Sequence, residues 1–167
     1  RPLLDPQHLL SEPAMVDLLS FLAFHERESK VPIRVVLFAS TDDPTGVLDL
    51  QAVCDSWFDP EQASGCMLAY FLGRPDRSRL YFPTWSPDLG SMLKSAGALV
   101  RCVRSAEVVE NDISQLDRFG VELSMQIFRA QKILQARTGD QFSERRAITI
   151  LGPEQVATSR TGGAGFF

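Results

Sequence analysis

Hydrophobic residues in the amino-terminal part of the chain gather in two short, almost unbroken runs. The first, VPIRVVLFAS at residues 31–40, contains Arg34 as its one charged residue, and the second, CMLAYFLG at residues 66–73, contains none. Runs of this length that are rich in β-branched and aromatic residues predict strands. Because polar positions are nearly absent, we expect both faces of these strands to be covered, as in the interior of an α/β sheet.

The stretches around these runs show apolar residues at helical spacing. This amphipathic pattern predicts helices at residues 12–29, at residues 47–58 and from Ser86 to about residue 103. Two of these helices have clear start signals, because Ser11 and Ser86 can cap the backbone and each is followed closely by a proline.

The order of these elements predicts the topology of the sheet. A helix connects residues 33–40 with residues 66–73, so these strands should lie parallel, whereas the short turn at 73–78 should return the chain as an antiparallel strand at 79–82. Pro83 limits that last strand and favours an edge position. We therefore predict an α/β fold, in which a small, mixed, mostly parallel sheet is covered by helices on both faces in three layers and is followed by a long carboxyl-terminal helix.

The long helix is predicted over residues 106–138, with Gly139 ending it. Its apolar and small residues recur in alternating steps of four and three, which is typical of a heptad seam. We expect this seam either to pack on the sheet and the preceding helix or to form a coiled coil, and its carboxyl half, around 127–134, to contact the 140–167 tail or another copy of the chain. The seam residues assigned to interaction are Val109, Ile113, Leu116, Leu123, Ile127 and Leu134.

We expect the chain to form one α/β domain followed by an extension. The domain is predicted at residues 1–139, with its core at 3–104, and the extension at 140–167. We predict one short strand at residues 147–151 of this extension. The Gly-rich tail after it is expected to be mobile or to dock on another surface.

Composition narrows the class of protein. Hydrophobic residues make up 44% of the chain and the net charge is −4, without a basic face, so we predict a folded domain that binds no nucleic acid. Three cysteines at irregular spacing predict buried free thiols, or one disulfide pair in an oxidising compartment. No apolar run is long enough to span a membrane. The start at Arg1, without a methionine, leaves room for a removed signal or lipid anchor that would bring the protein near a membrane.

Charged residues cluster in the two turns that follow the predicted parallel strands, at the sheet edge where α/β proteins commonly bind ligands. Asp42 and Asp43 can ligate a hard cation such as Ca²⁺ or Mg²⁺. Two adjacent carboxylates supply few ligands, so we expect no required cofactor and only weak binding of such an ion. Arg74, Arg77 and Arg79 can hold a phosphate group. The same residue types are also typical of a polar turn and a solvated hairpin.

Other catalytic groups are scarce. His8 and His25 are the two histidines of the chain, both lie near its start, and no Ser-His-Asp arrangement can be recognised. His25 has no second histidine or cysteine one helical turn away, which indicates a surface or packing histidine rather than a metal ligand. The sequence therefore assigns no catalytic residue.

The order of these segments resembles the TPM-domain family. The resemblance rests on Asp5 before a capped helix, the IRVVLF run, a helix that ends in Trp57, Gly65 before an apolar strand, and a hairpin in which Asp76-Arg77 leads into RLYF. It covers about residues 3–104. Members include thylakoid-lumen proteins of photosystem II repair and bacterial membrane-anchored proteins. The resemblance implies a mixed sheet between helices, a periplasmic or membrane-anchored location outside the cytoplasm and, for some members, acid phosphatase activity and divalent-metal binding.

Two functions remain as expectations. The first is a non-catalytic interaction or accessory module of a membrane-associated or exported protein, which assists the assembly or regulation of a protein partner or forms a homo-oligomer through the long helix. The second is a divalent-metal-assisted hydrolase, similar to an acid phosphatase, that uses Asp42 and Asp43. The sequence favours the first because no nucleophile or metal site with defined partners can be recognised.

Overall fold

The structure, a computed structural model, describes the backbone of residues 1–150 and the side chains of residues 1–138. It divides the chain into two compact units, Arg1–Ala130 and Gln131–Phe167, and the first contains the whole sheet. The predicted boundary between a domain and a carboxyl-terminal extension stays a prediction, and the Gly-rich tail lies outside the described residues. Of the helices that the structure describes, none has the length and apolarity needed to cross a bilayer.

A four-stranded sheet of order β1-β2-β3-β4 forms the centre of the first unit. β2 and β3 run parallel with Ile33 opposite Cys66, and β3 and β4 run antiparallel with Leu68 opposite Leu80. Both predicted pairings are therefore confirmed, as is the edge position of β4. The strands are β1 (Leu3–Leu4), β2 (Ile33–Ala39), β3 (Cys66–Leu72) and β4 (Arg79–Tyr81).

The strand β1 is absent from the sequence prediction, because two residues carry no periodic pattern. Leu3 and Leu4 pair in parallel with Val35 and Val36, and the N–H of Val35 donates to the carbonyl oxygen of Pro2 over 2.8 Å. β1 therefore forms the edge of the sheet opposite β4.

The α-helices connect or follow the strands. The first agrees with its predicted bounds, and Ser11 caps it by accepting a hydrogen bond of 3.3 Å from the N–H of Ala14. The second begins later than predicted, because Pro44–Gly46 forms a separate 3₁₀ turn and Asp49 caps the helix at Leu50. The described helices are α1 (Glu12–Ser29), α2 (Leu50–Trp57), α3 (Asp88–Ser95), α4 (Ala98–Glu107) and α5 (Asp112–Ile150).

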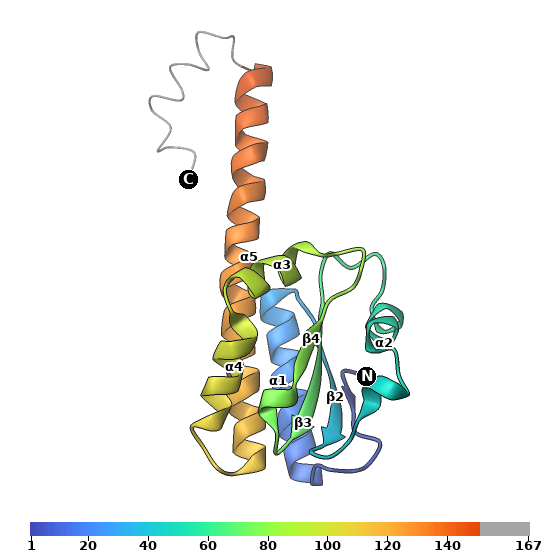
Figure 1. Cartoon of the computed structure of the whole chain (residues 1–167). Helices are drawn as coiled ribbons and strands as arrows, with labels where there is room; N and C mark the ends of the chain where they lie inside the picture. The colour runs from blue at the N-terminus through green and yellow to red at the C-terminus, as the bar shows by residue number, and fades with distance from the viewer. Residues whose placement is uncertain (151–167) are drawn as a thin grey trace. The chain divides into compact units, whose positions relative to one another are not determined.

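Helices cover both faces of the sheet, with α2 on one side and α1 on the other (Figure 1). α2 buries Leu50 against alternating residues of β2 and β3. On the opposite face, Phe119 of α5 meets Tyr70 of β3 edge-on, with their ring centroids 5.2 Å apart. The side chains of His25 in α1 and Ser124 in α5 lie 2.6 Å apart, which joins these two helices. The predicted α/β architecture, with a mostly parallel mixed sheet between helices, is confirmed.

The prediction of one continuous helix after Ser86 is wrong, because two helices form there. Gly97 has a φ of 66°, a left-handed conformation that other residues rarely adopt, and it separates α3 from α4. Ser86 is not the cap of α3, since its hydroxyl donates to the carbonyl oxygen of Ala63. Both helices bury residues, Leu93 from α3 and Ala98 from α4.

The predicted start of the long helix, at residue 106, is also wrong. Residues 106–107 end α4, and α5 begins at Asp112. Asn111 explains the new start, because its Oδ1 accepts hydrogen bonds of 3.0 Å from the N–H groups of Ile113 and Ser114. An asparagine that satisfies two free N–H groups is a typical helix cap.

The predicted end of this helix is wrong as well. α5 continues through Gly139 to Ile150, so residues 147–150 are helical and the strand predicted at 147–151 is not formed there. A glycine inside a helix costs about 1 kcal/mol relative to alanine, which is too little to end a long helix by itself.

The heptad seam assigned to interaction lies largely in the core of the first unit. Leu116 is 2% exposed, and Leu123 and Ile127 are fully buried. Val109, Ile113 and Leu134 are half-buried. A partner cannot reach the buried residues of the seam without displacing α5. The contact expected between residues 127–134 and the tail falls outside the described residues.

Candidate functional site

The carboxyl ends of the parallel strands form the first candidate site. The loop after β1 leads to α1 and the loop after β2 leads to α2, on opposite faces of the sheet, an arrangement that opens a crevice in many α/β proteins. Here Gln7 Nε2 donates to Asp42 Oδ2 over 2.6 Å, and the N–H of Ala39 donates to the same oxygen over 2.8 Å. These donors, Gln7 first, lower the pKa of the Asp42 carboxyl. The Asp42 carboxylate thus ties the two loops together.

Asp43 points to a different partner. Its Oδ1 accepts a hydrogen bond of 2.7 Å from the hydroxyl of Thr45. Within the side chains that the structure describes, no three residues among His, Cys, Asp and Glu gather closely enough to hold a metal ion. Since Ca²⁺ takes about six to eight oxygen ligands, these two carboxylates alone make a weak site. The weak metal site predicted at Asp42 and Asp43 stays a prediction.

Arg77 fixes the loop after β2. Its guanidinium donates to the carbonyl oxygens of Ser40 and Asp42 over 2.6 and 2.7 Å, and it lies 4.2 Å from the centre of the Phe71 ring. A half-buried guanidinium that is bound to backbone oxygens and stacked on a ring has a structural role.

The other two arginines assigned to phosphate binding are turned to partners of their own. Arg74 forms an ion pair of 2.9 Å with Asp76, and Arg79 donates to the carbonyl oxygen of Ser78 over 2.8 Å. Although the turn brings the three arginines into one segment, their guanidinium groups bond to separate acceptors. The predicted phosphate site stays a prediction, and the polar-turn interpretation describes these contacts better.

His25 lies in a buried hydrogen-bond network, which confirms the packing interpretation. Its Nδ1 is 2.6 Å from Ser124 Oγ, its Nε2 is 3.0 Å from Ser29 Oγ, and its ring meets Phe128 edge-on. Burial lowers the pKa of His25 from 6.5 to about 4. A fully buried histidine between two serines joins helices and has no route to a substrate.

The cysteines offer no reactive thiol. All three are free and buried, as one of the two predicted alternatives has it. Burial raises the pKa of Cys54 and of Cys102 to about 12, so both remain protonated at neutral pH. Since the thiolate is the nucleophile, these side chains act as core residues.

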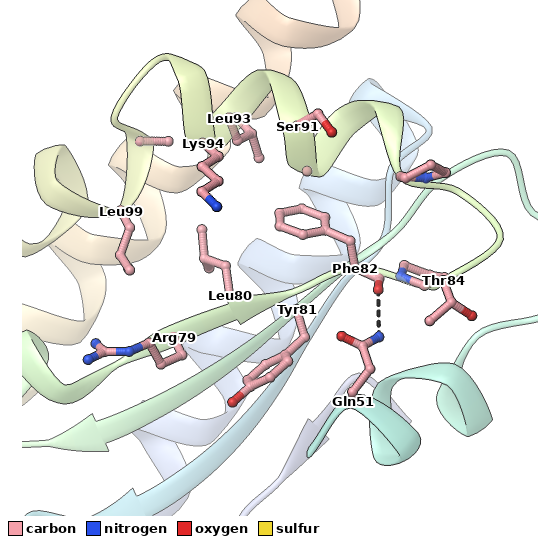
Figure 2. A pocket seen from close by; sticks show the side chains of 14 residues that line it. Gln51, Arg79, Leu80, Tyr81, Phe82, Thr84, Ser91, Leu93, Lys94 and Leu99 are labelled. Carbon is pink, nitrogen blue, oxygen red and sulfur yellow. Dashed lines mark hydrogen bonds between the residues drawn. The ribbon is translucent and has the colours of Figure 1, made fainter. Parts of the chain in front are cut away.

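The second candidate site is a pocket of about 540 Å³ beside the edge strand β4 (Figure 2). We call it the β4 groove, and it is lined by residues 79–84, by residues of α3 and α4, and by Gln51 of α2. Consecutive side chains of a strand point to opposite faces, so a hollow lined by every residue from 79 to 84 follows the outer edge of the strand. Its inner surface is mainly apolar, and Leu80 of β4, Leu93 of α3 and Leu99 of α4 contribute to it.

The sequence builds this groove by holding the end of β4. Gln51 Nε2 donates to the carbonyl oxygen of Phe82 over 2.8 Å. Asp55, on the same helix, accepts hydrogen bonds of 3.0 and 3.1 Å from the N–H and hydroxyl of Thr84, and the N–H contributes most to its lowered pKa. On the other side, Gly90 leaves room for the Phe82 ring, because a Cβ atom at residue 90 would lie 2.6 Å from that ring.

The groove carries positive charge on an acidic protein. Its lining residues include Arg79 and Lys94 and no aspartate or glutamate, whereas the chain as a whole has a net charge of −4. Lys94 reaches from α3 toward Leu80 (Figure 2). The groove therefore combines apolar walls with two cationic side chains, and its lining residues include no pair of groups suited to general acid–base catalysis.

Sequence reasoning does not assign Leu80, Lys94 or Leu99 to a site. Pro83 correctly indicates that β4 is an edge strand, which is the one available signal of an open surface. The residues that line the groove come from separate elements, and the turn at Gly97 that brings α4 beside α3 is not predicted.

These features define the chain as a three-layer α/β protein with an apolar groove on an edge strand. No protein-family model matches the chain, and no curated protein matches it.

Proposed function

We propose that this chain is a non-catalytic interaction module whose β4 groove binds a segment of a partner protein. The observation that carries this proposal is an open, mainly apolar hollow that follows an edge strand. Covering such a surface removes apolar area from water, which favours association. By contrast, the polar groups at the carboxyl ends of the strands bond chiefly to one another.

The resemblance to the TPM domain bears on where this module acts. It favours a periplasmic or membrane-anchored protein in which the module assists the assembly or regulation of its partners. The largely buried seam of α5 gives less support to association through the long helix.

Two neighbouring residues of α4 provide a matched test of the groove. Leu99 lines it and is half-buried, whereas Val100 is 53% exposed and lies outside it. Peptides selected from a random library on the wild-type domain are expected to bind Leu99→Arg at least about tenfold more weakly, because arginine fills and charges the hollow. The same peptides should bind Val100→Arg with unchanged affinity.

Calorimetry on both variants measures this difference, after circular dichroism has shown that each is folded. Equal affinity for the two variants, or the absence of any selectable peptide, would remove the groove as the binding surface.

The second candidate function is a divalent-metal-assisted phosphatase at Asp42 and Asp43. Its support is their place at the carboxyl edge, where the loops after β1 and β2 diverge. We expect no hydrolysis of p-nitrophenyl phosphate in the presence of Ca²⁺ or Mg²⁺. Turnover that disappears in the Asp43→Asn variant would establish the hydrolase instead.

A further inference from the structure

The peptide groups of Leu80 face the open edge of the sheet. The N–H of Cys66 donates to the carbonyl oxygen of Pro32 over 3.0 Å, so this residue of β3 turns its peptide groups toward β2. Successive residues of a strand alternate in this respect, so Met67 turns its peptide groups toward β4, where it pairs with Tyr81. Tyr81 therefore bonds to β3, and Leu80 presents its N–H and carbonyl oxygen on the outer side.

The next residue of the same orientation is Phe82. Its carbonyl oxygen points away from β3, as the alternation requires, and accepts the hydrogen bond from Gln51. The outer edge thus offers the N–H and oxygen of Leu80 and the N–H of Phe82 to a neighbouring strand, directly beside the groove.

The surface continues beyond the groove. A neighbouring hollow of about 550 Å³ shares Gln51 and Tyr81 with it and extends over residues 45–50, where Val47 is 84% exposed. An occupant that follows β4 can therefore continue past the strand over this second hollow, whose lining is more polar and includes Thr45 and Asp49. This continuity favours an extended segment over a compact small molecule.

We propose that the segment bound by this module is an extended peptide that adds a strand to β4 and carries both apolar and acidic residues. Main-chain hydrogen bonds to Leu80 and Phe82 would supply affinity, and side chains in the groove would supply specificity. The acidic residues are inferred from charge complementarity with Lys94, which reaches toward Leu80 on one face of β4, and with Arg79, whose side chain lies on the other face of the strand. This inference rests on the proposed function and adds the chemistry of the partner to it.

A second copy of the chain fits the same edge less well. Two β4 strands paired with each other would bring the Arg79 and Lys94 of both copies together around one small hollow. Basic residues on edge strands are a known protection against such self-pairing. An acidic partner is attracted by the charges that keep a second copy away.

Synthetic peptides test the mode of binding directly. The probes are acetylated and amidated eight-residue peptides in which valine alternates with aspartate, and control peptides in which valine alternates with lysine. We expect the aspartate peptide to bind at least about tenfold more tightly by calorimetry, with an affinity that falls as salt is added. Equal binding of the two peptides, or no binding of the aspartate peptide, would overturn the inference.

N-methylation separates strand addition from general groove binding. Alternate N–H groups of a strand point to opposite sides, so only one set pairs with β4. Methylating either all valine or all aspartate nitrogens should therefore weaken binding at least about tenfold for one set and leave the other unchanged. If both methylated peptides bind alike, strand addition is wrong, whereas the proposed function still stands if library peptides depend on Leu99.

The charge contact has its own matched pair of variants. Lys94→Glu and Arg101→Glu make the same change in charge on exposed helix positions, but only Lys94 lines the groove. Lys94→Glu should weaken the preference for the aspartate peptide, because Arg79 alone then remains as a cation in the groove, and Arg101→Glu should preserve the preference. An equal effect of both variants would show that net charge, and not the groove, selects acidic peptides.

Discussion

Replacing Ile127 by aspartate is expected to unfold the first unit or to destabilise it by several kcal/mol. Ile127 is fully buried, and one turn away on either side Leu123 and Ala130 are 0% and 4% exposed. A carboxylate at this position has no solvated direction in which to turn. An unpaired buried charge costs several kcal/mol or more, on the order of the whole stability of a small domain.

Met125 provides the control for this experiment. It lies on the same helix, but it is 44% exposed. Met125→Asp should therefore unfold in urea close to the wild-type midpoint, whereas Ile127→Asp should not. If the two variants unfold alike, α5 does not pack on the sheet in solution, and the seam would again become the leading surface for a partner.

Acidification from pH 6.5 to pH 4 is expected to destabilise the protein by about 3 kcal/mol through His25 alone. The pKa of His25 is lowered from 6.5 to about 4 by burial, so the folded state resists the proton that the unfolded chain accepts. Above pH 6.5 the imidazole is neutral in both states, and the cost is absent. As pH falls below 6.5 the unfolded state binds the proton first, and the loss is complete once pH drops below about 4.

The titration of carboxyl groups changes the stability mainly below this pH range, or in the direction opposite to that of His25. The lowered pKa values of Asp42, Asp55 and Asp76 mean that these groups lose their favourable contacts at still lower pH. Burial, together with the nearby Asp17, raises the pKa of Asp117, which therefore favours folding as pH falls. The difference between variants isolates the histidine from both effects.

His25→Gln keeps a polar side chain between Ser29 and Ser124 but cannot titrate. Its free energy of unfolding should change less between pH 6.5 and 4 than that of wild type, by about 3 kcal/mol. Identical pH profiles for wild type and His25→Gln would show that His25 is not buried in solution.

The central elements of the fold could be predicted because their signals are local and strong. The apolar runs that become β2 and β3 specify buried strands, and the helix between them requires a parallel pairing. The errors lie where a short-range feature interrupts a continuous pattern. Apolar residues recur across Gly97 as in one helix, yet the left-handed backbone there starts a new one. Asn111 likewise caps α5 inside an apparently unbroken seam.

The candidate site was harder to predict for a different reason. Asp42 and Arg77 are conspicuous in the sequence, but their hydrogen bonds hold loops in place. Leu80, Lys94 and Leu99 read as ordinary strand and helix positions. Their common feature is a place around the open edge of β4, and that depends on the packing of α3 and α4 rather than on any motif.

Amide chemical shifts provide the most direct test of the β4 groove as the binding surface. A library-selected peptide would be titrated into the nitrogen-15-labelled domain. We predict shifts confined to residues 79–84 and to the parts of α3, α4 and α2 that line the groove, with the Leu80 amide among the largest. Shifts centred instead on the loops around Asp42 and Asp76 would contradict this account and would place binding at the carboxyl edge of the sheet.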